Sequence, residues 1–145
     1  MTFGHKIVLD ANILVRAVLG TQVPDLLERY CRHVRFYTPT SCFTEARDHL
    51  PSILTKRSHV APGITLGALD ALCAMVQPVD ESAYAAFEAE ARRRISERDR
   101  DDWPLLALAM ALDCPIWTED QDFFGTGMAT WRTRNVEIYL SGSSP

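Results

Sequence analysis

Short apolar segments alternate with longer helical segments along the chain, and this alternation limits the fold more than any other feature. Residues 7–9 and 34–38 are brief and rich in β-branched or aromatic side chains, which favours buried strands. Residues 76–79 and 115–118 are further strand candidates. Because helical segments separate these strands, neighbouring strands are expected to pair in parallel. The sequence predicts a three-layer α/β/α sandwich around a mainly parallel sheet of about four to five strands.

The remaining segments are assigned from periodicity and from Pro and Gly. Residues 58–63 are expected to form a loop, and the alternation of apolar and polar residues over 136–140 predicts a last edge strand. Residues 1–140 are expected to form a single domain, and 141–145 a flexible tail. The predicted helices cover residues 13–17, 24–33, 41–56, 66–75, 83–98 and 102–112.

Size and composition fit one globular domain. The chain has 145 residues, of which 47% are hydrophobic and 23% charged, and its formal net charge is −4. That charge gives nucleic acid no overall attraction, although a local basic patch could still bind it. No apolar run reaches the roughly 20 residues that span a bilayer, and the first residues lack a signal-peptide cleavage pattern. We expect a cytoplasmic protein with no membrane association, whose cysteines are buried free thiols: Cys31, Cys42, Cys73 and Cys114.

Two acids follow predicted strands directly. Asp10 comes after residues 7–9, and Asp120 comes soon after residues 115–118. The carboxyl ends of parallel strands share one edge of the sheet, and ligands bind at that edge. Asp10 and Asp120 are therefore expected to lie close together, although Asp10 could also be an ordinary helix N-cap.

Two further acids have positions that depend on how the helices pack. Glu45 falls at the margin of an apolar stripe, where a carboxylate would be partly desolvated and would need a cation or a partner such as Arg47. Asp102 opens a helix, and it reaches the sheet edge only if that helix begins near it. A set made only of acids suits Mg²⁺ or Mn²⁺, and such ions support phosphodiester hydrolysis by activating water and neutralising phosphate charge.

Four segments resemble, in order, the signature blocks of PIN domains. They are residues 7–14, 44–45, 102–109 and 118–123, and the resemblance extends from Ile7 to about Leu140. It implies that Asp10, Glu45, Asp102 and Asp120 are the metal-site acids and that Asp122 is an accessory acid. It also implies that Asn12 and Thr118 orient these acids. Asp101 is a rival to Asp102, which we prefer because it lies seven residues before Ala109, as in the family's block.

The resemblance also implies an activity and partners. PIN domains of this kind are Mg²⁺- or Mn²⁺-dependent endoribonucleases, and short single-domain members are commonly VapC-like toxins. Such toxins form homodimers and are held inactive by a cognate antitoxin protein. The expected function is thus RNA cleavage by the toxin of a type II toxin–antitoxin pair. The alternatives are a housekeeping PIN nuclease and a non-catalytic PIN-like module that binds RNA.

Three other features have open interpretations. Glu119 stands where many PIN domains carry a basic residue, and it would add negative charge beside the site. The arginines of residues 92–100 form either a solvated helix face with i,i+4 ion pairs or a patch that steers phosphate. The aromatic, glycine-containing segment 123–131 either packs on the sheet edge or stacks on a nucleotide.

Overall fold

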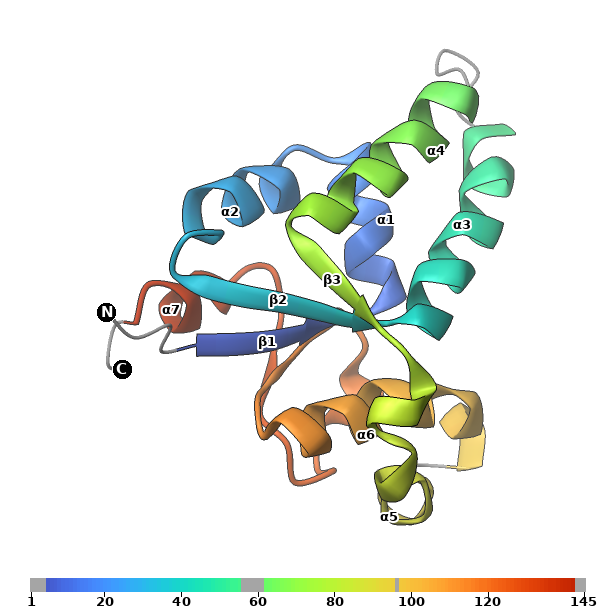
Figure 1. The fold of residues 1–145 in the computed structure, drawn as a ribbon, viewed down its shortest axis with the longest axis vertical. Coiled ribbons are helices and arrows are strands. Elements are labelled where there is room, and N and C mark those ends of the chain that lie inside the picture. Colours follow the sequence, from blue (N-terminus) through green and yellow to red (C-terminus); the bar gives the residue numbers. More distant parts are fainter. Residues whose placement is uncertain (1–4, 56–61, 96, 143–145) are drawn as a thin grey trace.

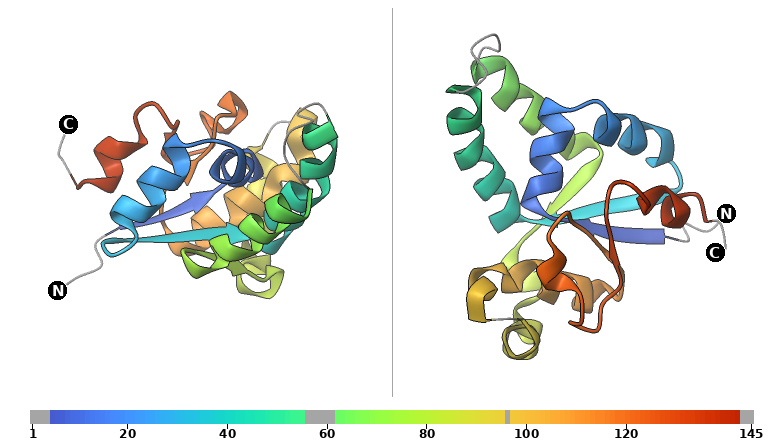
Figure 2. Two further views of the ribbon diagram at one scale, coloured as in Figure 1. Left: turned by 90° about the horizontal axis from the view of Figure 1, so that it is seen from above. Right: turned by 180° about the vertical axis from the view of Figure 1, so that it is seen from behind.

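A parallel sheet runs through the centre of the protein. The computed structural model describes residues 5–55, 62–95 and 97–142 (Figures 1 and 2). The sheet has five strands in the order β3-β2-β1-β4-β5, and every neighbouring pair is parallel. The strands are β1 (His5–Leu9), β2 (Val34–Pro39), β3 (Val76–Val79), β4 (Ile116–Trp117) and β5 (Thr130–Trp131).

Helices cover both faces of this sheet. Figure 1 shows α1 to α4 on one side and α5 and α6 on the other, which confirms the predicted α/β/α sandwich. Four short 3₁₀ segments, Leu72–Ala74, Glu81–Ala83, Ala85–Phe87 and Glu97–Asp102, lead into or out of the helices, and a fifth is described with the site. The helices are α1 (Ala11–Leu19), α2 (Gln22–Tyr30), α3 (Thr40–Thr55), α4 (Pro62–Ala71), α5 (Glu88–Arg94), α6 (Trp103–Leu112) and α7 (Val136–Leu140).

The core lies where β1 meets the helices. Ile7, Val8 and Leu9 are all fully buried, because helices cover both faces of a parallel sheet. Helix α6 is buried along most of its length, since it packs on β1 and β2 and also on α5. This packing fixes α6, and with it the preceding residue Asp102, relative to β1.

Residues 136–140 form helix α7, so the predicted edge strand is wrong. Val136 and Leu140 are 0% and 2% exposed, whereas Ile138 between them is 43% exposed. Burial at i and i+4 is the spacing of one helix face, whereas a strand would place all three side chains on the same face. The helix lies beside the start of β1 (Figure 2), where the Tyr139 hydroxyl donates to the Lys6 carbonyl at 2.7 Å.

The fifth strand instead comes from the segment with the two glycines. Trp131 lies in β5 and Phe123 is buried, so this segment packs on the sheet edge, while Phe124 remains 54% exposed. Glycine supports the turn before β5, because Gly125 and Gly127 have φ of 87° and 94°.

Three other predictions need correction or fall partly outside the described residues. The predicted helix over 83–98 is broken into short 3₁₀ turns and α5, and α5 ends where Ile95 adopts an extended conformation. Cys31 and Cys73 are exposed, so only Cys42 and Cys114 fit the expectation of buried thiols. Residues 62–63 of the predicted 58–63 loop begin helix α4, and the rest of that loop and residues 143–145 of the predicted tail lie outside the described residues. None of the described helices is long and apolar enough to cross a membrane.

Candidate active site

Asp10 lies at the carboxyl end of β1, and both oxygens of its carboxylate accept hydrogen bonds. Oδ1 accepts from the Ala11 backbone N–H at 2.7 Å, so Asp10 is indeed the N-cap of α1. Oδ2 accepts from the Thr118 hydroxyl at 2.6 Å and from the Asn12 amide at 3.2 Å. The side chain is therefore held in one orientation at the edge of the sheet where ligands are expected.

The surroundings of Asp10 oppose its negative charge. Asp10 is only 8% exposed, and burial raises the pKa of its carboxyl from 3.8 to about 6. Hydrogen bonds from Thr118 and Ala11 lower that pKa, while the charges of Glu45 and Asp120 raise it. A buried acid beside two other acids is a group whose ionised form a cation would stabilise.

Thr118 and Asn12 tie the end of β1 to the end of β4. These strands are neighbours in the sheet, and the Asp10 backbone N–H donates to the Trp117 carbonyl at 3.0 Å. The fully buried Thr118 hydroxyl donates to Asp10 and accepts from the Asp120 backbone N–H at 3.0 Å. Asn12 donates to Thr118 at 3.3 Å and accepts from the Glu119 backbone N–H at 3.4 Å. One buried hydroxyl thus positions both Asp10 and the segment that carries Asp120.

Asp120 and Asp122 belong to one turn after β4. The Asp120 carboxylate accepts from the Asp122 backbone N–H at 2.9 Å and caps the 3₁₀ turn Gln121–Phe123. Both acids are half-buried. Asp120 lies close enough to Asp10 to raise its pKa, as parallel strand geometry predicts.

Glu45 and Asp102 approach from two helices. Glu45 is in the second turn of α3, and Asp102 directly precedes α6. Both line a small hollow of about 40 Å³, together with Cys42 and Asp101. The chain thus places the start of α6 near α3, which was the condition for Asp102 to reach the site. Asp102 is half-buried, whereas Asp101 is exposed.

Cys42, which sequence analysis did not place at the site, marks where these acids meet. Burial raises the pKa of its thiol well above the usual value, and the charges of Asp10, Glu45 and Asp102 raise it further. One buried sulfur therefore lies within electrostatic reach of acids from β1, α3 and the start of α6. Its position on the apolar stripe of α3, three residues before Glu45, is the only sequence signal that points to it.

The environment expected for Glu45 is wrong in two respects. Its side chain is exposed rather than partly desolvated, because the margin of the α3 stripe faces an open groove. Arg47 does not serve as its partner, since Arg47 forms an ion pair with Asp70 and lies over the Phe43 ring at 5.6 Å. Glu45 is thus an accessible acid beside the buried Asp10.

The donor set suits a hard cation, although its side chains have not converged. Within residues 5–55, 62–95 and 97–142, no three His, Cys, Asp or Glu side chains are gathered closely enough to hold a metal ion. Acids of like charge repel one another without a cation between them. Asp10 is hydrogen-bonded in place, whereas the exposed Glu45 has room to reorient. The donor chemistry, all carboxylate oxygen around a buried acid of raised pKa, fits Mg²⁺ or Mn²⁺.

Glu119 does not add its charge to the acid cluster. Its carboxylate accepts from the backbone N–H and hydroxyl of Thr133 at 2.8 and 2.5 Å, and it pairs with Arg132 at 3.5 Å. Burial raises the pKa of Glu119, but the Thr133 hydrogen bonds and the Arg16 and Arg132 charges outweigh it and hold the pKa below its usual value. Glu119 therefore anchors the segment after β5 to the end of β4.

The arginines of α5 lie on a solvent-exposed helix face, where they form ion pairs with glutamates of the same helix. Arg92 pairs with Glu88 at 2.8 Å, while Arg93 and Arg94 both pair with Glu90. The Arg92 guanidinium also lies 5.1 Å from the centre of the Trp103 ring. For Arg92, Arg93 and Arg94, these contacts favour the structural interpretation over a phosphate-steering patch.

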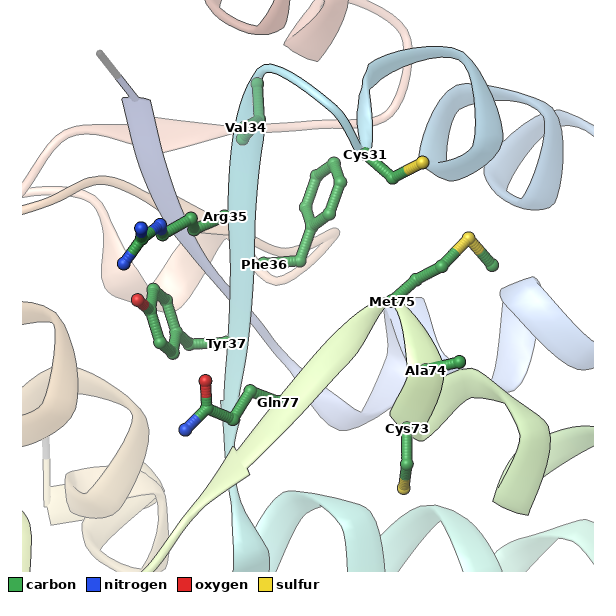
Figure 3. Close-up of a pocket in the computed structure, with 9 residues that line it drawn as sticks. All are labelled: Cys31, Val34, Arg35, Phe36, Tyr37, Cys73, Ala74, Met75 and Gln77. Atoms are coloured by element: carbon green, nitrogen blue, oxygen red, sulfur yellow. The ribbon is translucent and has the colours of Figure 1, made fainter. Parts of the chain in front are cut away.

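A larger hollow of about 460 Å³ lies away from the acids. It opens beside β2 and the 3₁₀ turn Leu72–Ala74, and Figure 3 shows Phe36 on one side of β2 and Arg35 and Tyr37 on the other. No carboxylate lines it, so it has none of the chemistry found at the end of β1. Its lining consists of Cys31, Val34, Arg35, Phe36, Tyr37, Cys73, Ala74, Met75 and Gln77.

Comparisons with known proteins agree with the fold. Solved structures with a similar fold include VapBC2 from Rickettsia felis bound to a promoter DNA fragment (TM-score 0.65, 15% identity, 88% of this chain and 98% of that chain). PAE2754 from Pyrobaculum aerophilum aligns with a TM-score of 0.69 at 12% identity over 95% of this chain and 90% of that one. FitAB bound to the IR36 DNA fragment aligns with a TM-score of 0.53 at 20% identity, over 88% of this chain and 94% of that one.

Comparison of the sequence with curated proteins finds no match. A family model described as the PIN domain matches residues 8–141, which include every acid discussed above. The chain belongs to the PIN domain family.

Proposed function

We propose that this protein is a Mg²⁺- or Mn²⁺-dependent endoribonuclease that hydrolyses RNA phosphodiester bonds. The observation that carries the proposal is Asp10, a buried carboxylate at the carboxyl edge of the sheet whose pKa of about 6 is raised by burial and by the charges of Glu45 and Asp120. PIN domains are generally nucleases, which supports a hydrolase. The acids proposed to hold the cation are Asp10, Glu45, Asp102 and Asp120, with Asp122 as an accessory acid and Asp101 as an alternative to Asp102.

The chain's own residues would prepare the site before substrate arrives. A bound cation would supply Lewis-acid chemistry at the scissile phosphate. Thr118 and Asn12 hold the Asp10 carboxylate in place, and Thr118 also fixes the backbone of Asp120. Glu45 on α3 and Asp102 at the start of α6 line one hollow, and their charges act on Cys42 together with that of Asp10. The clustered negative charge would repel phosphate in the absence of a cation, so activity should depend on it.

We also propose that the protein is the toxin of a type II toxin–antitoxin pair, acting in the cytoplasm as a homodimer with a cognate antitoxin partner. The support is the similarity of this fold to chains of VapBC2 and FitAB, of which the alignments cover 98% and 94%. A housekeeping PIN nuclease, or a non-catalytic PIN module that binds RNA, would have the same fold. Growth arrest on expression, relieved by Asp10→Asn, would support the toxin, and harmless overexpression would count against it.

Cleavage of single-stranded RNA by the purified protein tests the enzyme. We expect cleavage with Mg²⁺ or Mn²⁺, loss of cleavage in chelator, and no cleavage by Asp10→Asn. Asp80→Asn is a matched control, because Asp80 directly follows β3 at the same edge of the sheet, two strands away from β1, and its exposed carboxylate accepts from the Ser82 hydroxyl. Equal activity in chelator would rule out the metal mechanism. Wild-type activity of Asp10→Asn would leave Asp10 as a helix cap alone.

A further inference from the structure

A groove between α1 and α3 begins at the candidate active site. It has a volume of about 410 Å³, within the range of small-molecule sites. Its lining includes Asn12 and Glu45, which also belong to the acid site. The groove is therefore continuous with the site and not a separate pocket. Its other lining residues that matter here are Val15, Arg16, His49 and Ile53.

The groove leads away from the acids along both helices. Arg16 is one turn beyond Asn12 on α1, and His49 and Ile53 are one and two turns beyond Glu45 on α3. Eight residues of helix correspond to about 12 Å. A molecule bound by its phosphate at the acids would thus have about that length of wall along which to extend.

The walls combine apolar, aromatic and cationic groups. Val15 and Ile53 are half-buried aliphatic side chains, while His49 and Arg16 are exposed. Among the described residues, the Arg16 guanidinium forms no ion pair within 4 Å, although its charge helps to lower the pKa of Glu119. A flat ring can lie against aliphatic and imidazole surfaces, and a guanidinium is suited to phosphate.

We infer that this groove is a subsite for one nucleotide of single-stranded RNA next to the scissile phosphate. The base lies against Val15, Ile53 and His49, and the neighbouring phosphate contacts Arg16. This inference rests on the proposed function. Charge favours RNA over a protein segment, because a cation held by the acids at one end and the Arg16 guanidinium along the wall would match the repeated negative charges of a nucleic acid backbone.

Binding of nucleoside 5′-monophosphates tests the subsite without requiring cleavage. The probes are AMP, GMP, CMP and UMP with Mg²⁺, compared with ribose 5-phosphate, which lacks only the base. We expect at least one nucleotide to bind about tenfold more tightly than ribose 5-phosphate, because stacking of one base is worth roughly 1–3 kcal/mol. Amide chemical shifts in ¹H–¹⁵N spectra should change at Val15, Arg16 and His49.

Two variants separate the base from the phosphate. His49→Ala should weaken nucleotide binding and leave ribose 5-phosphate binding unchanged, whereas Arg16→Gln should weaken both about tenfold. The matched controls are His33→Ala and Arg134→Gln, which change exposed residues outside the groove. With RNA as substrate, Arg16→Gln should raise KM with little change in kcat or in Mn²⁺ affinity.

The results also distinguish the subsite from the enzyme. Ribose 5-phosphate binding as tightly as every nucleotide would overturn the subsite, even if the protein cleaves RNA. Nucleotide binding that is unchanged in both His49→Ala and Arg16→Gln would also overturn the subsite, and a protein segment would then be the remaining candidate to occupy the groove. Selective nucleotide binding by a protein that cleaves no RNA would support the subsite while refuting the proposed activity.

Discussion

At the scale of single residues, Thr118 connects the most parts of the candidate site. Its hydroxyl is fully buried, donates to Asp10, and accepts from the backbone of Asp120 and from Asn12. A buried polar group that loses its partner destabilises the folded state by about 1–3 kcal/mol. Removing the hydroxyl would leave three groups of the site short of one contact each.

Replacement of Thr118 by the isosteric Val tests this positioning role. We expect Thr118→Val to lower the free energy of unfolding by about 1–3 kcal/mol. Because Asp10 would lose its shortest hydrogen bond, Mn²⁺ affinity should fall by about 10–100-fold, the usual effect of removing a group that orients a metal ligand. Urea denaturation measures the first effect, and calorimetric titration with Mn²⁺ measures the second.

Thr38→Val is the matched control. Thr38 is also fully buried, at the end of the neighbouring strand, and its hydroxyl donates to the Leu9 carbonyl at 2.8 Å. This variant should lose similar stability and keep its Mn²⁺ affinity. An equal loss of Mn²⁺ affinity in both variants would show that the effect comes from general destabilisation.

At the scale of elements, helix α6 connects two parts of the candidate site, Asp102 before its first residue and strand β4 after its last. Asp102 precedes its first residue, and Pro104 occupies the first turn, where a missing N–H is tolerated. At its other end Asp113 adopts a left-handed conformation with φ 52°, and its N–H closes the helix on Ala109 and Met110. This reversal sends the chain into β4, towards Thr118 and Asp120.

Asp113 is the position at which a single substitution should stabilise the protein. Glycine adopts the left-handed conformation without the steric penalty of a Cβ atom, so Asp113→Gly should raise the free energy of unfolding by about 0.5–1 kcal/mol. RNA cleavage should not change, because Asp113 is exposed and outside the site. Asp113→Ala removes the same charge but keeps Cβ. If Ala stabilised as much as Gly, the gain would come from the lost charge and not from the backbone.

At the scale of the whole molecule, the packing divides the four thiols into two classes. Cys31 and Cys73 are exposed, whereas Cys42 and Cys114 are buried. Burial raises the pKa of Cys114 to about 12, and the Lys6 charge only partly offsets this. The reactive form is the thiolate, so a raised pKa protects a thiol at neutral and mildly alkaline pH.

Thiol titration at pH 8 therefore reports on the whole fold. We expect Cys31 and Cys73 to react with an aromatic disulfide reagent, Cys73 more slowly because burial and the Asp70 charge raise its pKa. Cys42 and Cys114 should react only after unfolding. Cys31→Ser should remove the faster of the two early phases. Four rapid thiols in the folded protein would contradict this packing.

Metal binding should also stabilise the whole molecule, independently of any RNA. A ligand that binds only the folded state at about 100 times its Kd stabilises that state by about 2.7 kcal/mol. Excess Mn²⁺ should raise the melting temperature of the wild type, and chelator should reverse the effect. Asp10→Asn should show little response, and Asp80→Asn should respond as the wild type does. A melting temperature insensitive to Mn²⁺ and Mg²⁺ would contradict the proposed metal site.

The sequence by itself determined the first four strands, their parallel pairing and the neighbourhood of Asp10 and Asp120. These follow from local periodicity and from the rule that parallel strands end at the same edge, so they need no knowledge of side-chain packing. Covalent adjacency to a strand was sufficient to place these two acids. Their binding of a metal remains a prediction, as does the organisation of residues 1–140 as one domain.

Only the tertiary structure decided the features that depend on which face of an element is covered. The alternation over 136–140 is compatible with a strand or a short helix, and the burial of Val136 and Leu140 selects the helix. The sequence places Glu45 on the margin of the apolar stripe of α3, but the exposure of its side chain depends on the groove beside that helix. Glu119 is turned away from the site by Thr133, a residue fourteen positions later. Long-range contacts of this kind leave no local periodicity, because they form only when distant segments pack together.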